Sequence, residues 1–277
     1  MAINPGARNP EMFQHAYLLA KDFDGTVACT FQKSPAGIGV HETYEQAVEE
    51  LFGLPSLEAY LKNGGLQNQS PSEVVRGIAS DADASELEQL TARFVDTKLA
   101  ISLGQIGTRF PDGSVWPRPT PGYLELCEKI QAAREGGRMI DDLIISAGHE
   151  PFIKKTYETW GIDLPTHIVA EDTLRRLIKK GVLGASIEQL NKPSPILMDI
   201  ALNTWKRGYD IDDTIEVPGE RDRIVYAGDD PKRDGKLAET SGVAFVLVKQ
   251  GAELQAWQSV ATWLQLGRLA ATGAQHE

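Results

Sequence analysis

Two aspartates stand two residues apart at the end of an apolar stretch near the amino terminus, in the run LLAKDFDGTV from Leu18 to Val27. Asp22 and Asp24 follow residues typical of a buried strand, and a Gly-Thr turn comes next. Asp-Gly is also common in solvated turns, so the pair alone fits a plain turn equally well. At the carboxyl end of a central parallel strand, however, both carboxylates would lie where open α/β sheets bind ligands. One could bind a metal or attack a substrate while the other transfers protons.

Three later segments share this arrangement, in which polar residues follow an apolar strand or open a helix. They are Ser146-Ala147-Gly148, Asn191-Lys192-Pro193, and the run GDDPKRD from Gly228 to Asp234. Strand ends of this kind meet at one edge of a doubly wound sheet, so we expect the four segments to form one site. They supply carboxylates, a hydroxyl and a lysine, which is the set that magnesium-assisted phosphoryl transfer requires.

Strands and helices alternate over the second half of the chain. The apolar patterns predict short strands at 143–145, 167–170, 224–227 and 243–248, and helices at 151–160, 193–205 and 257–269. Thr120-Pro121 is a further helix start, with a cap residue before a proline at the first helical position. Strands separated by helices run parallel with right-handed crossovers. We therefore predict an α/β fold with a doubly wound parallel sheet.

A helical stretch without any strand pattern lies between the first strand and this alternating part. Its apolar residues recur at helical spacing, and Ser85 with Glu88 has the pattern of a capping box. Turn-rich connectors border the stretch on both sides. We therefore predict a helical domain at 34–116, inserted into a core domain formed by residues 1–33 and 117–277.

The composition narrows the class of protein. The 277 residues include 39 acidic and 28 basic ones, and the net charge of -11 argues against a nucleic-acid or anionic-membrane partner. Cys29 and Cys127 form no metal-binding spacing and are expected to be reduced thiols. The first residues lack the plan of a secretion signal, and no apolar run approaches the roughly 20 residues that span a bilayer. We expect a soluble, cytoplasmic protein, with a solvated acidic loop at 207–222.

The DxDGT sequence, followed in order by the serine, lysine and acidic segments, resembles the haloacid dehalogenase (HAD) superfamily, whose members are mostly phosphatases. The resemblance extends from Tyr17 to about Val248, with the helical stretch in the position of that family's C1-type cap domain. It implies a Rossmann-like core and a magnesium-dependent phosphatase. The substrate would be a small phosphorylated metabolite, such as a sugar phosphate, a phosphorylated organic acid or a nucleotide.

The resemblance also implies roles for individual residues. Asp22 would attack phosphorus and form an aspartyl-phosphate. Asp24 would protonate the leaving alcohol and then activate water, which requires a raised pKa or a proton held by its surroundings. Mg²⁺ would be bound by a carboxylate oxygen of Asp22, the backbone carbonyl of Asp24, and Asp229.

Phosphate-binding residues and supporting acids follow from the same resemblance. Lys192 would pair with the phosphate and with Asp22. Asp230 would be a metal ligand or would support one, and Asp234 would orient the metal site or Lys192. The step from Asp229 to Asp234 is one residue longer than the commonest family spacing, which leaves the assignment of these acids open by one position. The remaining phosphate-binding candidates are Gly25, Thr26, Ser146 and Ala147.

Other activities share the scaffold. Asp24 counts against a dehalogenase, which has no alkoxide to protonate. A phosphonate hydrolase would need a cap lysine, for which Lys62 is a candidate, but that branch usually lacks the second aspartate. A phosphomutase would keep every core residue and differ only in its cap. A non-catalytic binding protein would be expected to have a damaged motif, and all four are intact.

Some residues near these motifs have simpler interpretations. His149 stands at a helix start and is expected to cap the helix or face solvent. Cys29 is expected to be a packing residue, because no neighbouring histidine or cysteine would activate it. Basic residues in and next to the helical stretch are candidate substrate contacts, although most exposed basic residues only solvate a surface. They are Lys33, Lys62, Arg76, Arg109 and Arg118.

Overall fold

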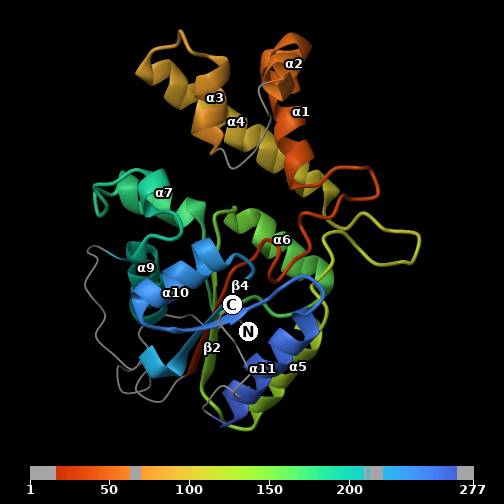
Figure 1. The fold of residues 1–277 in the computed structure, drawn as a ribbon, viewed down its shortest axis with the longest axis vertical. Helices are drawn as coiled ribbons and strands as arrows, with labels where there is room; N and C mark the ends of the chain where they lie inside the picture. The colour runs from red at the N-terminus through yellow and green to blue at the C-terminus, as the bar shows by residue number, and fades with distance from the viewer. Residues whose placement is uncertain (1–16, 63–69, 209–210, 212–220, 267–277) are drawn as a thin grey trace. The chain divides into compact units, whose positions relative to one another are not determined.

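The computed structural model describes residues 17–62, 70–208, 211 and 221–266 (Figure 1). The chain divides into two compact units. One unit comprises Met1–Cys29 and Pro119–Glu277, and the other comprises Thr30–Arg118. The helical insertion predicted at 34–116 falls within the second unit.

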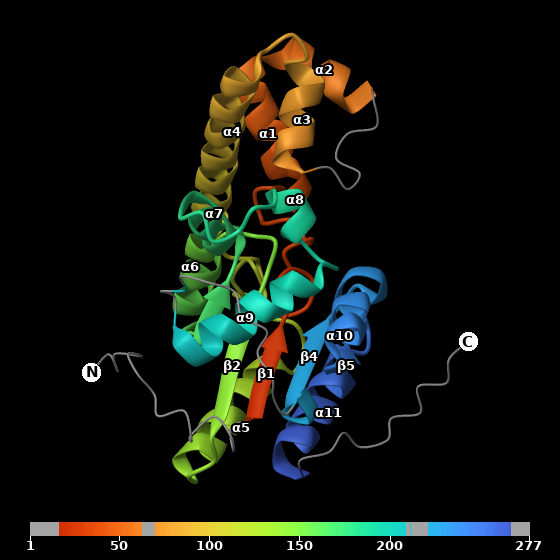
Figure 2. The ribbon, with the colours of Figure 1, turned by 90° about the vertical axis from the view of Figure 1, so that its left-hand side faces the viewer.

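A five-stranded parallel sheet forms the centre of the first unit, with the strand order β3-β2-β1-β4-β5 (Figure 2). β1 (Tyr17–Lys21) lies in the middle, between β2 (Ile140–Ile145) and β4 (Ile224–Gly228). β3 (His167–Val169) and β5 (Ala244–Leu247) lie at the edges. This confirms the predicted α/β fold, and the DxDGT sequence follows the central strand.

Helices pack on both faces of this sheet (Figures 1 and 2). α9 and α10 contact each other, and α5 contacts α11. The helices of this unit are α5 (Tyr123–Glu135), α6 (Glu150–Trp160), α7 (Glu171–Lys179), α8 (Ile187–Leu190), α9 (Pro195–Arg207), α10 (Lys236–Ser241) and α11 (Glu253–Leu266), with a short 3₁₀ turn η2 (Arg221–Arg223) and a further turn η3 (Pro231–Gly235).

Successive side chains of β1 enter two different buried layers, because strand residues alternate between the faces of a sheet. Leu18 and Ala20 belong to an apolar cluster that includes Met198 of α9. Lys21 contacts Tyr123 of α5 and therefore lies on the other face. The residue that follows Lys21, Asp22, is thus directed toward the α9 side of the sheet.

Lys21 is a fully buried lysine held in an ionic network. Its Nζ donates to Asp142 Oδ2 at 2.7 Å and to the Tyr123 hydroxyl at 3.0 Å. Arg134 Nη2 donates to the other carboxylate oxygen of Asp142 at 2.8 Å. Burial alone would raise the pKa of Asp142, but the charges of Lys21 and Arg134 outweigh it and lower the pKa to about 2.

Acid unfolding should report on this network. The folded-state pKa of Asp142, about 2, lies below the reference value of 3.8, so its stabilisation is present above pH 4 and is lost as the pH falls toward 2. We expect Asp142→Asn to lower the free energy of unfolding by about 2 kcal/mol at pH 7 and by less at pH 3. Urea unfolding at both pH values measures this, with the exposed Asp222→Asn as control. An equal loss at both pH values would contradict the assignment.

The described part of the second unit contains four helices and no strand. They are α1 (Val40–Phe52), α2 (Leu54–Lys62), α3 (Pro71–Ile78) and α4 (Ala84–Gln105). Ala47 and Val48 of α1 pack with Val75 and Phe94 in a separate apolar core. This unit therefore has a hydrophobic core of its own.

The predicted capping box at Ser85 is wrong. α4 begins at Ala84, and its N-cap is Asp83, whose carboxylate accepts a hydrogen bond from the Glu86 amide at 2.9 Å. Asp competes well with Ser as an N-cap, and here the helix extends two residues further toward the amino terminus.

The predicted helix start at Thr120 is also wrong, and α5 begins at Tyr123 instead. Thr120 does not act as its cap, because its hydroxyl donates to the Thr26 carbonyl at 2.7 Å. Gly122 precedes the helix with φ +88° and redirects the chain. Thr120 therefore stabilises the DxDGT loop through this hydrogen bond and does not start a helix.

Two predictions fall partly outside the described residues. The acidic stretch 207–222 is described only at its ends and at Ile211, and the last helix is described to Leu266. Within the described parts of the chain, every helix is too short or too polar to cross a membrane.

Candidate active site

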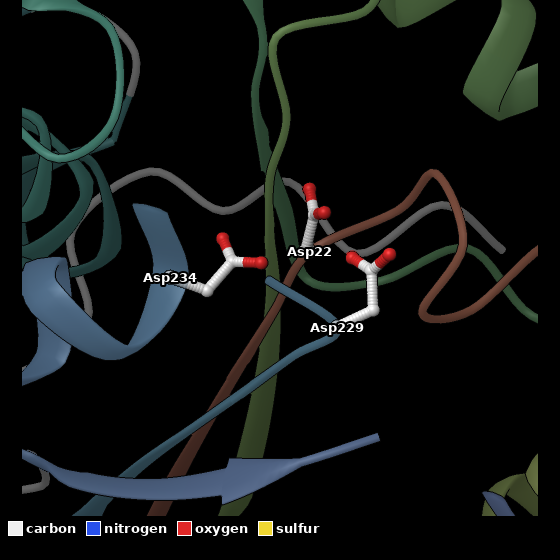
Figure 3. A group of neighbouring side chains, drawn as sticks. All are labelled: Asp22, Asp229 and Asp234. Carbon is white, nitrogen blue, oxygen red and sulfur yellow. The ribbon is translucent and has the colours of Figure 1, made fainter. Parts of the chain in front are cut away.

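The parallel register brings the first and fourth sequence segments together. Lys21 pairs with Ala227 of β4, and the Asp22 amide donates to the Ala227 carbonyl at 2.8 Å. Asp229 follows the end of β4 directly. Figure 3 shows Asp22, Asp229 and Asp234 gathered in one place, and one carboxylate oxygen from each lies within 4.8 Å of the others.

Lys192 joins this group from the turn before α9. It is 8% exposed, and its Nζ lies 2.5 Å from Asp22 Oδ1 and 2.8 Å from Asp234 Oδ1. The turn is closed by a hydrogen bond from the Ser194 amide to the Asn191 carbonyl at 2.9 Å. Burial would lower the pKa of Lys192, but the two carboxylates outweigh it and raise the pKa, so the ammonium is charged.

The Asp22 carboxylate is in an unfavourable environment for an anion. Its pKa is raised to about 8: burial is the largest cause, the charges of Asp234 and Asp24 act in the same direction, and Lys192 acts against them. An additional positive charge beside Asp22 would favour its ionised form. The site is therefore suited to bind a cation.

Asp234 is fully engaged within the protein. The Tyr226 hydroxyl donates to its Oδ1 at 2.9 Å, and the Asp230 amide donates to its Oδ2 at 3.1 Å. Together with the ion pair to Lys192, these contacts occupy both oxygens. Asp234 is therefore better placed to orient Lys192 than to bind a metal. Sequence reasoning missed Tyr226, whose only signal was a hydroxyl within a buried strand.

The turn η3 explains the long step between the acids of the fourth segment. The Gly235 amide bonds to the Asp230 carbonyl at 3.2 Å, five residues back, which is a single turn of π-helix. Such a turn holds one residue more than an α-helical turn. Asp230 caps it, because its Oδ1 accepts from the Lys232 amide at 2.8 Å and the Arg233 amide at 3.2 Å. Asp234 reaches Lys192 despite the extra residue.

Gly228 is required by the close approach of Asp234. A Cβ at this position would lie 2.4 Å from the Cβ of Asp234. We expect Gly228→Ala to lower the free energy of unfolding by about 1–3 kcal/mol, because the buried Asp234 must shift away from Lys192 and Tyr226. Thermal or urea unfolding measures the change. Gly184→Ala is a matched control, since a Cβ there meets nothing within 4 Å. Equal stability of the two variants would contradict the argument.

Thr26 lies beside Asp229. It is fully buried, and its hydroxyl donates to Asp229 Oδ1 at 3.1 Å. Burial and the charge of Asp234 raise the pKa of Asp229, while the Thr26 bond acts against this. Gly25 makes the preceding turn with φ +76°, a conformation that favours glycine. The Thr26 side chain thus orients Asp229, and its phosphate-binding role stays a prediction.

The serine segment meets the second aspartate of the first segment. Ser146 is 3% exposed, and its Oγ lies 3.5 Å from Asp24 Oδ2 and accepts from the Gly148 amide at 2.8 Å. Ala147 is exposed between them. All four sequence segments therefore contribute to one region at the carboxyl ends of β1, β2 and β4.

The expectation for His149 is wrong. Its ring is 4% exposed, and it makes no side-chain capping bond to α6. The amide of Glu150 is instead satisfied by Asp172 Oδ2 at 2.7 Å, and this oxygen lies 3.6 Å from His149 Nδ1. The shorter and charged Asp172 side chain takes the capping role.

Several of the candidate cap residues have partners within their own unit. Lys33 pairs with Glu42 at 2.6 Å, and Arg118 pairs with Asp112 at 2.7 Å. Arg109 donates to the Gly113 carbonyl at 3.1 Å. Each of the three side chains thus has a partner within the protein, and no substrate is needed to explain its position.

Comparison with known proteins points to one family. Residues 189–263 match the HAD-hydrolase-like family, a range that includes Lys192, Asp229 and Asp234. No curated protein sequence matches the chain significantly.

Three solved structures illustrate the similarity in fold. One, described as a predicted phosphoglycolate phosphatase from Haemophilus somnus 129pt, is 15% identical, with a TM-score of 0.50 over 84% of this chain and 85% of that one. CbbY from Rhodobacter sphaeroides, in complex with phosphate, is 16% identical, with a TM-score of 0.48 over 84% and 86%. β-Phosphoglucomutase from Clostridium difficile is 12% identical, with a TM-score of 0.48 over 84% of each chain. The first comparison shows a shared fold.

Proposed function

We propose that this HAD-like hydrolase chain is a magnesium-dependent phosphatase that hydrolyses a small phosphate monoester through an aspartyl-phosphate on Asp22. The observation that carries the proposal is the pairing of buried Asp22 with buried Lys192 at 2.5 Å, beside the carboxylate of Asp229. A strand end with these three groups combines a nucleophile, a cation that offsets phosphate charge, and a metal ligand.

The residues fit a magnesium ion. Asp22 and Asp229 offer carboxylate oxygens, which hard divalent cations prefer, and the backbone carbonyl of Asp24 is a third ligand implied by the family resemblance. Asp234 is spatially close but committed to Lys192 and Tyr226. Bound Mg²⁺ supplies positive charge that keeps Asp22 ionised and offsets the charge of the phosphate.

The protein groups then have distinct tasks. Asp22 attacks phosphorus and carries the phosphoryl group between the two half-reactions. Lys192 holds a phosphate oxygen and keeps Asp22 in place through their ion pair. Ser146 and the amide of Ala147 hold further phosphate oxygens.

Asp24 is the acid and base of the proposed reaction. It protonates the leaving alcohol in the first half-reaction and takes a proton from water in the second. Its carboxylate lies 3.5 Å from Ser146 Oγ, so the acid stands beside a phosphate-binding hydroxyl. A dehalogenase would have no use for this second acid.

We further propose that the helical unit is a cap domain, as predicted for residues 34–116. It would select the leaving group, and the core residues 1–33 and 117–277 would carry out the chemistry. The proposed substrate class is a small phosphorylated metabolite.

Metal removal tests the proposal. Hydrolysis of an aryl phosphate should fall by at least about 100-fold with excess chelator and return with added Mg²⁺. Phosphate release measures this, and transfer of the phosphoryl group to a second hydroxyl of the substrate would indicate a phosphomutase instead. Equal rates with and without chelator would contradict the proposal.

A further inference from the structure

A pocket of about 560 Å³ lies in the sheet-containing unit, and its lining includes none of the catalytic, metal or phosphate-binding candidates. Its walls come from the loop after α7, from α8, from the start of α9, from η2 and from the end of α10. Figure 2 shows α8, α9 and α10 on the same side of the sheet. Small-molecule sites commonly have volumes of this order.

One wall of the pocket is polar and carries both signs of charge. The Arg221 guanidinium donates to the Ser241 carbonyl, and its Nη2 lies 3.6 Å from Asp199 Oδ1. The Ser241 side chain is buried, and its Oγ has no hydrogen-bond partner in the described protein. That oxygen is shielded from solvent, so the charged groups of Arg221 and Asp199 are the ones that a ligand in the pocket can reach.

Other lining residues of the pocket are apolar. Leu183 and Leu190 are buried there, and Ile196 is 42% exposed beside them. An isoleucine on the first turn of a helix can contact an apolar ligand without any rearrangement of the core. The pocket therefore combines an apolar surface with a paired cation and anion.

We propose that this pocket binds an α-amino acid with an apolar side chain. The ligand carboxylate would accept from Arg221, the ammonium would donate to Asp199, and the side chain would contact Ile196 and Leu190. An anion alone would meet Asp199 and a cation alone would meet Arg221. A zwitterion matches both charges.

The pocket is connected to the candidate active site through the chain. Leu190 stands two residues before Lys192, and Pro195 stands three residues after it. Ser241 ends α10, which follows directly on the turn that carries Asp234. An occupant therefore contacts the segments that position both members of the Lys192–Asp234 ion pair. This coupling rests on the proposed function, and binding in the pocket should therefore change kcat/KM for the phosphate ester.

Calorimetric titration of the whole chain with L-leucine tests the binding. We expect a Kd of about 1 mM or tighter. 4-Methylpentanoate lacks the ammonium and isopentylamine lacks the carboxylate, and each should bind at least about tenfold more weakly. The absence of binding heat with L-leucine, L-methionine and L-phenylalanine would overturn the proposal, as would binding of either analogue as tightly as L-leucine.

Two variants locate the binding site. Ile196→Glu changes an exposed side chain and should retain the fold, yet it should weaken L-leucine binding about tenfold or more. Leu164→Glu is the matched control, because Leu164 is also 42% exposed but lies outside the pocket. Unchanged affinity in Ile196→Glu would contradict the site. The same titration on Asp22→Asn keeps the result independent of turnover, so failure of the proposed phosphatase reaction leaves this test intact.

Discussion

Asp22→Asn should reduce turnover of phosphate monoesters by about 10⁴-fold or more, because an amide cannot form the aspartyl-phosphate. The substitution keeps the shape of the side chain but removes the charge that pairs with Lys192 at 2.5 Å. Steady-state phosphate release gives the size of the loss. Acid quenching followed by mass spectrometry should find one added phosphoryl group on the wild-type chain and none on the variant.

Asp141→Asn is the matched control for this experiment. Asp141 is also a buried aspartate next to the central strand, and its carboxylate accepts from the Trp205 indole at 2.7 Å. It lies on β2, outside the group formed by Asp22 and Lys192. The control should keep its activity within about tenfold of wild type. An Asp22→Asn variant that also stays within that range would refute Asp22 as the nucleophile.

Lys192→Met should lower kcat/KM by about 10³-fold, because the phosphate loses a cation and Asp22 loses its ion pair. Two carboxylates, Asp22 and Asp234, would then face each other in a buried place without the ammonium between them. Their mutual repulsion favours protonation, and a protonated Asp22 is a poor nucleophile. We also expect a loss of stability of about 3–5 kcal/mol, since one member of a buried ion pair is removed.

Lys21→Met separates these two effects. Lys21 is equally a buried lysine paired with an aspartate, but it lies on the other face of β1, with Asp142 and Tyr123. Its replacement should cost stability with little loss of kcat. If Lys192→Met folds and retains kcat/KM within about tenfold of wild type, the phosphate-binding role of Lys192 is wrong.

The parallel α/β sheet and the place of the first aspartates could be predicted from the sequence. Apolar strand patterns and polar strand ends depend on local residue types, and parallel topology then brings the ends of β1 and β4 together. Local pattern and sheet topology were sufficient for these features. The pairing of Lys192 with Asp22 and the support from Asp234 were implied by the family resemblance and not by the local pattern.

Other features depend on contacts between residues that are distant in the chain. The Tyr226 hydroxyl donates to Asp234, but in the sequence Tyr226 looks like an ordinary residue of a buried strand. The Thr120 hydroxyl bonds to the Thr26 carbonyl, 94 residues away, and Thr120 does not start a helix. His149 is buried, and Asp172 on another helix accepts the hydrogen bond from the Glu150 amide at the start of α6. No local pattern contains these partners, so sequence reasoning could not anticipate them.

The π-helical turn after β4 has a consequence for how such a chain is recognised. The turn takes up one more residue, and Asp234 still reaches Lys192 at 2.8 Å. A search pattern that fixes the number of letters between the two acids would pass over this protein, although its side chains meet in space. An alignment that starts at the end of the strand and counts hydrogen-bonded turns, instead of residues, would place the two acids at equivalent positions.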